Sequence, residues 1–338
     1  MKKKALITGI TGMVGSHLAD FLLKKKDWKV IGVCRWRSPI ENIKHLISKS
    51  EKKNSNIIFD YADLNDYSSL LEIMKKHKPD YIFHLAAQSF PKASFDMPNV
   101  TFDTNISGTY RLLDTVVKTN IKPIIHVCSS SEVFGRVPKE KLPINEECSF
   151  HPASPYAISK VGTDLIGRFF FEAYDLKILT TRMFTHTGPR RSDFFAESSF
   201  AKQIAMIENI GNMDTVYVGN LNSLRTIADV RDAVRAYYML VTVKPKFGEV
   251  YNIGGNTSMT IKEILNYLIS ISSKKNKIKI KIDKKRLRPI DADLQVPDVS
   301  KFKSHTGWKP IINYKKTLKD LLYYWREKVS KEGMFFKR

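Results

Sequence analysis

The sequence predicts an α/β fold in which a doubly wound parallel sheet is joined to a second, smaller α/β domain. Short apolar runs alternate with amphipathic helical segments as far as Arg182, and the alternation stops there. A glycine-rich turn that begins at Gly9 follows the first of these runs. Strands separated by helices of this length indicate right-handed βαβ crossovers and therefore a parallel sheet.

The first half of the chain supplies most of the expected sheet. Its strands are expected at Ala5–Thr8, Lys29–Cys34, Asn56–Tyr61, Tyr81–Leu85, Ile124–Cys128 and Ile178–Arg182. The helices between them are expected at Val14–Lys24, Asp66–His77, Thr104–Thr119 and Pro155–Ala173. Apolar residues recur at helical spacing in the first helix, which gives it one face for the core: Val14, Leu18, Phe21 and Leu22.

After Arg182 strands and helices no longer alternate regularly. Helices are expected at Phe200–Ile207, Asp229–Val241, Ile261–Ile271 and Tyr314–Val329, and a strand at Val250–Ile253. Lys277–Ile282 alternates Lys with Ile, which predicts a half-buried edge strand with its charges outward. We expect a discontinuous division, with 1–182 plus about 228–253 in one domain and 183–227 plus 254–338 in the other.

Composition narrows the class of protein. Hydrophobic residues make up 43% of the 338 residues, which excludes wholesale disorder. The net charge of +22 favours anionic partners, although Lys-rich helical faces can also be simply solvated. The lysines are dispersed and no nucleic-acid-binding motif is present, so we expect no nucleic-acid partner. Neither a signal peptide nor a membrane-spanning run is recognised, and the three cysteines lack metal-ligand spacing. These features predict a cytoplasmic protein with reduced thiols, no membrane partner and no metal.

The glycine turn predicts a dinucleotide site. Gly9, Gly12 and Gly15 lie between the first strand and the first helix, with Thr11, Met13 and Val14 between them. Glycines permit the tight turn and let backbone N–H groups approach a pyrophosphate, and the helix N-terminus favours an anion. Strand, glycine turn and helix in this order are typical of a Rossmann-type domain.

The ends of the next two strands indicate which dinucleotide binds. Where an NAD-binding protein usually places Asp or Glu, this chain has Arg35, and an arginine there can hold a 2′-phosphate. We therefore expect NADP rather than NAD, the alternative being that the arginine is merely exposed. Asp63 and Leu64 follow the third strand and are expected near the adenine, although Asp63 could equally cap a helix.

A second group of residues carries chemistry. Tyr156 and Lys160 are spaced i and i+4, so a helix places them on one face, where the ammonium can lower the phenol's pKa. Ser130 follows the fifth strand and can orient a substrate hydroxyl toward Tyr156. Glu132 is more informative, because a simple dehydrogenase needs no carboxylate there, whereas β-elimination beside a ketone needs a base.

Together these residues resemble the GDP-mannose 4,6-dehydratase family of extended short-chain dehydrogenases, most closely its GDP-manno-heptose branch. The resemblance covers nearly the whole chain. The matching segments are Thr8–Gly15, Leu85–Ser89, Ser129–Gly135, Ser154–Lys160, Thr187–Arg191, Val218–Leu221, Arg288–Pro289 and Gly307–Pro310.

The resemblance implies roles for individual residues. It implies that Ser130, Glu132, Tyr156 and Lys160 are catalytic. It implies a cofactor contact at Leu85, Ala86 and Ala87, and a substrate or diphosphate contact at Ser89, Ser131, Thr185, Arg190, Arg225 and Arg288. The second domain would then bind a GDP-sugar, and the protein would be a homodimer or homotetramer.

Three departures from the family pattern bear on the substrate. Thr185 precedes His186 where the family has Asn, Ser130 replaces Thr, and Ser199 stands where the family places a lysine near guanine. The reaction that the resemblance implies is loss of water across C5 and C6 of GDP-mannose or GDP-manno-heptose, with internal hydride transfer from C4. A GDP-4-keto-6-deoxy-sugar reductase or a nucleotide-sugar C4 epimerase would use the same fold and shares most of the site. A binding protein with an inactive site is a further alternative.

Overall fold

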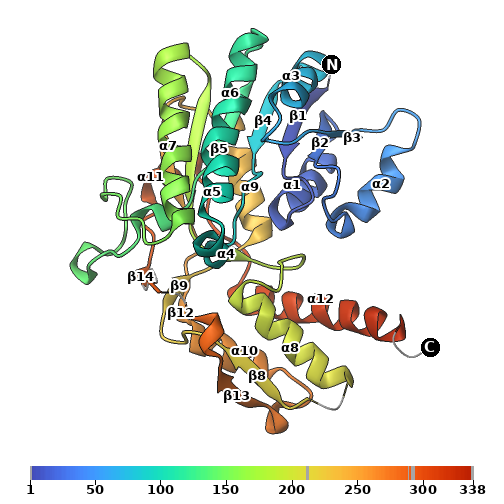
Figure 1. The fold of residues 1–338 in the computed structure, drawn as a ribbon, viewed down its shortest axis with the longest axis vertical. Helices are drawn as coiled ribbons and strands as arrows, with labels where there is room; N and C mark the ends of the chain where they lie inside the picture. The colour runs from blue at the N-terminus through green and yellow to red at the C-terminus, as the bar shows by residue number, and fades with distance from the viewer. Residues whose placement is uncertain (1, 211–212, 288, 291–293, 336–338) are drawn as a thin grey trace.

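A central parallel sheet organises the molecule, as the sequence predicts. The computed structural model describes residues 2–210, 213–287, 289–290 and 294–335. Within them, seven strands pair in the order β11–β6–β5–β4–β1–β2–β3, and each neighbouring pair is parallel (Figure 1). The strands are β1 (Lys3–Thr8), β2 (Trp28–Cys34), β3 (Ile57–Tyr61), β4 (Tyr81–His84), β5 (Ile124–Cys128), β6 (Ile178–Met183) and β11 (Val250–Ile253).

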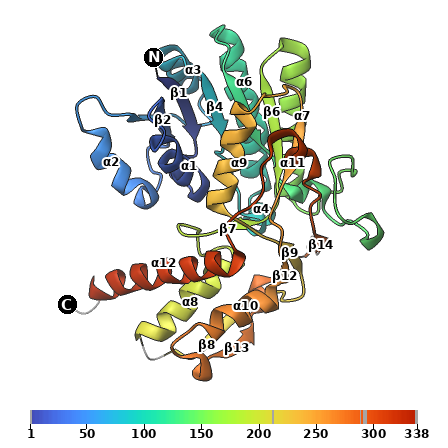
Figure 2. The same ribbon diagram turned by 180° about the vertical axis from the view of Figure 1, so that it is seen from behind.

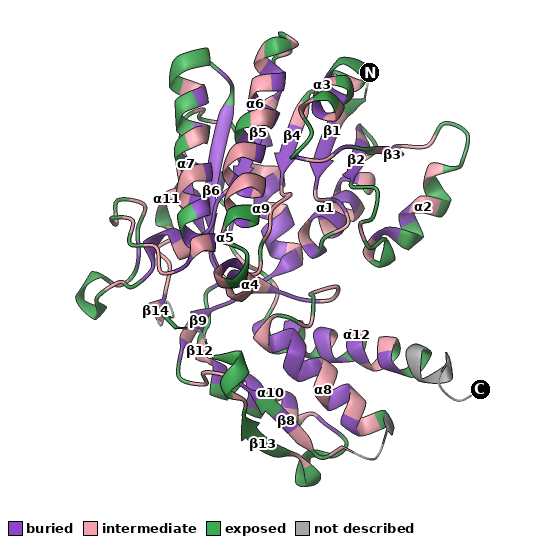
Figure 3. Cartoon of the chain, in the orientation of Figure 1, coloured by how far each residue is buried: buried purple, intermediate pink, exposed green. Residues whose placement is uncertain are grey.

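Helices cover both faces of the sheet, as seen from opposite sides in Figures 1 and 2. Because side chains alternate along a strand, Ala5 and Ile7 join one core while Leu6 joins the other. The first core contains α1 (Met13–Leu23), α2 (Lys44–Ser50), α9 (Val230–Thr242) and α11 (Ser300–Thr306). The second contains α3 (Tyr67–His77), α6 (Gly108–Lys118) and α7 (Pro155–Tyr174). Burial on both faces explains why the strands are almost continuously apolar (Figure 3).

The strand order creates a crevice beside β1. The chain runs from β1 outward to β2 and β3, then returns to β4 on the other side of β1. Loops at the carboxyl ends of β1 and β4 therefore diverge, and ligands of open α/β sheets bind at such a switch point. The glycine turn after β1 and Leu85–Ala87 after β4 both lie there.

A second cluster of elements packs around its own core below the sheet (Figure 1). It contains the helices α8 (Ala196–Ile210), α10 (Ile261–Ser270) and α12 (Tyr314–Phe335). Short strands join them: β7 (His186–Thr187) with β10 (Ala228–Asp229), β8 (Thr215–Val218) with β13 (Lys279–Ile282), and β9 (Leu224–Thr226) with β12 (Ser258–Thr260) and β14 (Leu294–Gln295). Trp308 and α11 pack against the sheet instead, so the late segments serve both cores, and the expected domain boundaries stay a prediction.

Two local expectations are corrected. The strand β13 is exposed along its whole length rather than half-buried: Ile280 and Ile282 lie at the surface, whereas Val216 and Val218 of its partner β8 are buried in the core of the second cluster. The predicted helix at 104–119 begins as a π-helix over Asp103–Ser107 before α6. Two short helices precede it, α4 (Pro91–Asp96) and α5 (Pro98–Phe102). Among the described residues, no helix combines the length and apolar character needed to cross a membrane.

Candidate active site

The glycine turn packs so tightly that side chains are excluded from two of its positions. Gly9 has a φ of +72°, and a Cβ there would lie 2.8 Å from the backbone nitrogen of Ala86. A Cβ on Gly15 would lie 2.3 Å from the carbonyl oxygen of Gly9. Gly12 is exposed, and a Cβ there would approach the Gly9 oxygen only to 3.3 Å. The N-terminus of α1 behind this turn has neither a capping side chain nor an acidic residue, which leaves it attractive to an anion.

A buried hydrogen-bond network fixes the loop after β4. The Thr8 hydroxyl accepts hydrogen bonds from the backbone N–H groups of Leu85 and Ala86, both at 3.1 Å. His84 lies between the hydroxyls of Thr8 and Thr109, at 3.0 Å from each. Burial lowers the pKa of His84 to about 3, so the imidazole stays neutral and this support for the loop does not titrate near neutral pH.

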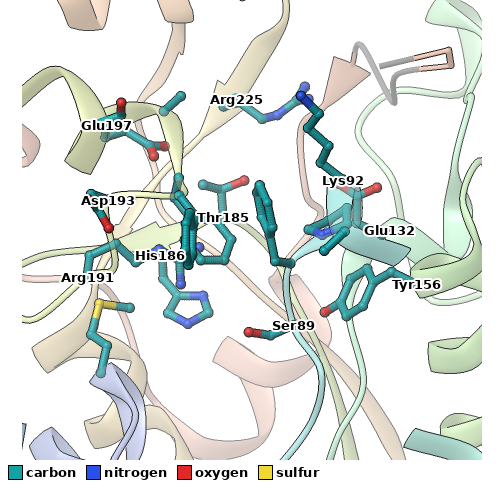
Figure 4. Close-up of a pocket in the computed structure, with 18 of the residues that line it drawn as sticks. Ser89, Lys92, Glu132, Tyr156, Thr185, His186, Arg191, Asp193, Glu197 and Arg225 are labelled. Atoms are coloured by element: carbon teal, nitrogen blue, oxygen red, sulfur yellow. The ribbon is translucent and has the colours of Figure 1, made fainter. Parts of the chain in front are cut away.

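The four predicted catalytic residues all line one cavity, which has a volume of about 950 Å³. Tyr156, Ser130 and Lys160 are almost fully buried, and Glu132 lines the same wall. The Tyr156 hydroxyl is hydrogen-bonded to Ser130, whose hydroxyl accepts the backbone N–H of Glu132 at 3.2 Å. Figure 4 shows Glu132 and Tyr156 on the same side of this cavity. A phenol, a hydroxyl and a carboxylate therefore share one site.

Electrostatics at Tyr156 differ from the sequence-based expectation. Burial raises the pKa of the phenol well above its ordinary value, and the Ser130 hydrogen bond and the positive charge of Arg191 oppose this rise. The Lys160 ammonium donates to the backbone carbonyl of Cys128 at 2.8 Å, and burial lowers the pKa of this lysine. The expected net lowering of the phenol's pKa is therefore corrected, because burial raises it.

The start of α7 is anchored by three polar side chains, two of which, Ser94 and Asn105, the sequence analysis did not single out. Ser154 caps the helix by accepting the N–H of Ala157 at 3.0 Å, and Ser94 accepts the N–H of Tyr156 at 3.0 Å. Asn105, in the π-helix, donates to the Ser159 hydroxyl at 2.8 Å. These contacts fix the rotation of α7 and therefore the direction of Tyr156. Only the Ser-Pro pair at 154–155 is a recognisable sequence signal, that of a helix start.

The expected cofactor residues fall into two groups. One group lines the cavity: Gly9, Gly12, Met13, Val14, Gly15, Leu85 and Ala87. The other lies outside the cavity lining. Arg35 is exposed directly after β2, Asp63 accepts the N–H of Asn65 at 2.9 Å, and Leu64 is buried in the sheet core. Thr11 accepts a hydrogen bond from Asn42 at 3.0 Å, and Ala86 contacts the glycine turn.

The expected substrate residues are also divided. Ser89, Ser131, Thr185 and Arg225 line the cavity, whereas Arg190 does not. Arg190 forms an ion pair with Asp20 of α1 at 2.8 Å, and its neighbour Arg191 lines the cavity instead. Arg288 lies outside the described residues.

Positive charge dominates the cavity wall. Cationic side chains line it at Lys92, Lys160, Arg191, Lys202, Arg225 and Arg286, against the acidic side chains Asp96, Glu132, Asp193 and Glu197. Arg286 was not singled out from the sequence, and it donates to the Ser199 hydroxyl at 3.1 Å. Within the described part of the chain, no group of His, Cys, Asp and Glu side chains is arranged to hold a metal ion. The cavity therefore suits an organic anion such as a diphosphate.

Comparison with known proteins supplies the family context. A family model described as GDP-mannose 4,6 dehydratase matches residues 6–321. GDP-mannose 4,6 dehydratase 1 of Arabidopsis thaliana is 34% identical over 341 residues, which cover 97% of this chain and 92% of that protein. GDP-mannose 4,6-dehydratase of Yersinia enterocolitica is 31% identical, over 92% of this chain and 90% of that protein.

Solved structures agree with the fold. The protein RMD from Pseudomonas aeruginosa, solved with NADPH, is 26% identical with a TM-score of 0.79, over 97% of this chain and 100% of that one. UDP-glucose 4-epimerase from Thermotoga maritima, solved with UDP-glucose, is 26% identical with a TM-score of 0.83, over 96% of this chain and 99% of that one.

Proposed function

Because the chain belongs to the GDP-mannose 4,6-dehydratase family, we propose that it removes one water from GDP-mannose or GDP-manno-heptose to give the 4-keto-6-deoxy sugar. The observation that carries this proposal is the position of Glu132, which lines the cavity beside the hydrogen-bonded pair Ser130 and Tyr156. Oxidation at C4 alone needs no such carboxylate, whereas elimination across C5 and C6 needs a base.

We propose NADP as the bound cofactor. The fit of a dinucleotide is supported by the glycine turn, where the exposed Gly12 carries no side chain to block approach to the uncapped N-terminus of α1. The exposed Arg35 after β2 would hold the 2′-phosphate, and Lys160 the nicotinamide ribose. The related RMD structure contains NADPH, in line with this choice. When bound, the cofactor supplies the hydride acceptor for C4 and returns that hydride at C6.

Tyr156 acts at the C4 hydroxyl. Ser130 hydrogen-bonds both the phenol and the substrate hydroxyl, so it sets the path along which the proton leaves the sugar. The positive charge of Arg191 favours the phenolate that results when Tyr156 is deprotonated. Lys160, held by the Cys128 carbonyl, keeps its ammonium at the floor of the site.

Glu132 acts next, on the carbon that the ketone has acidified. Its carboxylate removes the C5 proton, the electron pair forms the C5–C6 double bond, and the C6 hydroxyl leaves as water after taking a proton. Glu132, now protonated, or the neighbouring Ser131 supplies that proton, since both side chains line the cavity wall. Proton transfer by a positioned group is commonly worth about 10²–10⁴-fold in rate.

The cationic end of the cavity would hold the GDP diphosphate. Arg225 is buried in the cavity wall, and Arg286 lines the same cavity. We assign to Arg191, rather than Arg190, the substrate contact expected from the sequence, because the Arg190 guanidinium is already engaged by Asp20. Whether the sugar is the hexose or the heptose depends on the space beyond C6.

We also propose a cytoplasmic homo-oligomer that self-associates through α6 and α7. Ile158, Leu165 and Phe169 form an exposed apolar stripe on one face of α7, and Tyr110 of α6 is also exposed. The ion pair between Arg168 and Glu172 on the same helix offers both signs of charge to a second copy. Light scattering should show a dimer or tetramer, and Phe169→Lys should shift it toward the monomer.

The proposed reaction is tested directly with purified protein. We expect incubation with GDP-mannose or GDP-manno-heptose, without added NADPH, to yield a product lighter by one water in mass spectrometry. Absence of water loss there, together with stoichiometric consumption of NADPH in a separate incubation with a GDP-4-keto-6-deoxy sugar, would instead indicate a reductase. A C4 epimer of unchanged mass would indicate an epimerase, and either outcome would refute the dehydratase assignment.

A further inference from the structure

Glu197 is a largely buried acidic residue that has no role in the proposed mechanism. It stands in the first turn of α8 and is only 5% exposed, yet it lines the cavity. Among the described residues its carboxylate makes no hydrogen bond and no ion pair, and its oxygens are open to the cavity rather than sealed in the core. A ligand that supplies hydrogen-bond donors would therefore find a free acceptor there. The N-terminus of α8 is also a favourable place for a carboxylate.

Arg191 faces the same space and is also unsatisfied. Its Nε atom is buried without a hydrogen-bond partner in the described part of the chain, while its guanidinium stacks on Phe195 at 3.4 Å from the ring centroid. Glu197 and Arg191 interact electrostatically but do not form an ion pair. An acidic and a cationic side chain therefore line the cavity without pairing with each other, and a hydroxyl-bearing ligand could contact both, since a hydroxyl can both donate and accept.

The course of α8 shows which part of a GDP-sugar would lie there. Glu197, Ser199, Gln203 and Met206 all line the cavity, so the helix runs along it for several turns. Arg286 bonds Ser199, which assigns the phosphates to positions farther along the helix than Glu197. Figure 4 shows Glu197 and Arg191 across Thr185 from Glu132 and Tyr156. The sugar ring would fill the space between these two sides.

We propose that Glu197 and Arg191 form a sugar-reading subsite, in which Glu197 accepts hydrogen bonds from the C2 and C3 hydroxyls and Arg191 donates to them. These hydroxyls are the ones that the reaction leaves in place, since C4 is directed to Tyr156 and the C6 hydroxyl departs. The proposal rests on the proposed function and adds the residue pair that selects the sugar.

Calorimetric titration with GDP and with GDP-mannose tests the subsite. Glu197→Gln should weaken GDP-mannose binding about tenfold or more, because a hydrogen bond to a charged group is lost, and should leave GDP binding within about twofold. Glu208→Gln is the matched control on the same helix, since its carboxylate pairs with Arg326 at 2.7 Å and does not line the cavity. It should change neither affinity. Equal weakening of GDP and GDP-mannose by Glu197→Gln, or no weakening of either, would overturn the proposal.

Kinetics and stability provide two independent readouts. The wild type should prefer GDP-mannose to GDP-glucose, its C2 epimer, and Glu197→Gln should reduce that ratio of kcat/KM about tenfold. The ligand-free variant should unfold at the same temperature as wild type, because the Glu197 side chain has no hydrogen-bond or ion-pair partner among the described residues that the substitution would remove. An unchanged substrate ratio, or a lower unfolding temperature, would contradict a sugar-reading role. If the wild type binds GDP-mannose but releases no water, the proposed function is refuted. The calorimetric comparison of wild type with Glu197→Gln would still test the sugar-reading subsite.

Discussion

At the scale of single residues, burial shifts the pKa values of two groups in the candidate site. Tyr156 and Lys160 both carry pKa values displaced by desolvation, in directions that favour their neutral forms. Glu132 shares their cavity wall, beside Ser131. Acid–base chemistry at such a site depends on the protonation state of each side chain. Single substitutions can test that state.

Replacing Glu132 with Gln should separate oxidation from elimination. We expect water loss to fall about 10²–10⁴-fold, because a positioned base has been removed, while reduced cofactor accumulates as C4 oxidation proceeds. The measurement is product mass together with the absorbance of reduced nicotinamide. Near-normal water loss by Glu132→Gln would assign the C5 base elsewhere.

Arg191 should control the pH dependence of Tyr156. Its positive charge opposes the rise of the phenol's pKa, so Arg191→Gln should raise that pKa further. Since the base must be deprotonated to act, the acid limb of kcat/KM should move to higher pH, with activity recovered as pH rises. Arg190→Gln is the control, because its guanidinium pairs with Asp20, and its profile should match the wild type.

The adjacent arginines also show where inference from sequence stops at this scale. The motifs brought Ser130, Glu132, Tyr156 and Lys160 together correctly in space, because each follows a strand or starts a helix at the same edge of the sheet. Which arginine enters the cavity depends on the backbone at Arg190, whose φ is +71°. Arginine rarely adopts a positive φ, so the residue types in this turn do not predict that geometry.

At the scale of elements, the glycine turn and α1 form one unit. Gly15 sits where a methyl group would collide with the Gly9 carbonyl at 2.3 Å, whereas a methyl group on the exposed Gly12 would approach that oxygen only to 3.3 Å. The same substitution at the two positions should therefore act on different properties.

Gly15→Ala should destabilise the fold by about 1–3 kcal/mol through overpacking. Gly12→Ala should leave the thermal unfolding midpoint nearly unchanged but weaken dinucleotide binding at least about tenfold, because its methyl group would occupy the path of the pyrophosphate. Thermal unfolding and cofactor titration distinguish the two. A Gly12→Ala variant that binds NADP as tightly as wild type would place the pyrophosphate elsewhere.

Helices and strands of the sheet could be predicted from periodicity, but several irregular elements could not. The π-helix at Asp103–Ser107 carries an ordinary helical pattern, and its extra residue is fixed by contacts of Asn105 with Gln88 and Ser159. Strands such as β7 and β10 contain two residues each, too few for any alternation to be recognised.

At the scale of the whole molecule, the sheet core contains histidines that stay neutral. Burial lowers the pKa of His84 and of His126 from 6.5 to about 3. The unfolded chain binds more protons than the folded one between these values, so stability is complete above about pH 6.5 and falls as pH decreases toward 3.

Acidification should therefore weaken the fold. Each histidine should cost about 2 kcal/mol between about pH 7 and pH 5, measured by denaturant unfolding. His126 packs against Tyr237 at 4.3 Å, so His126→Phe retains a ring while removing the titration and should flatten the dependence. His151→Phe, at an exposed position, should leave the slope unchanged. An unaltered slope for His126→Phe would mean that other groups dominate.

The division of the molecule into two cores was only partly foreseeable. The regular alternation of strands and helices ends at Arg182, which predicts a second group of elements after it. The helices α8, α10 and α12 do share a separate core. Phe302 and Trp308 return to the sheet core late in the chain, because partners from β11 and α9 provide the apolar surface that covers them. The spacing of apolar residues predicts which face of an element is buried, but it does not predict against which core that face packs.

Internal return of hydrogen from C4 to C6 is the central claim about the whole enzyme. GDP-mannose labelled with deuterium at C4 tests it most directly, by mass spectrometry and NMR of the product. We predict that the label appears at C6 of a product that has lost one water, with no net reduction of cofactor. A product without the label at C6, or a reduced cofactor formed in stoichiometric amount, would contradict the account.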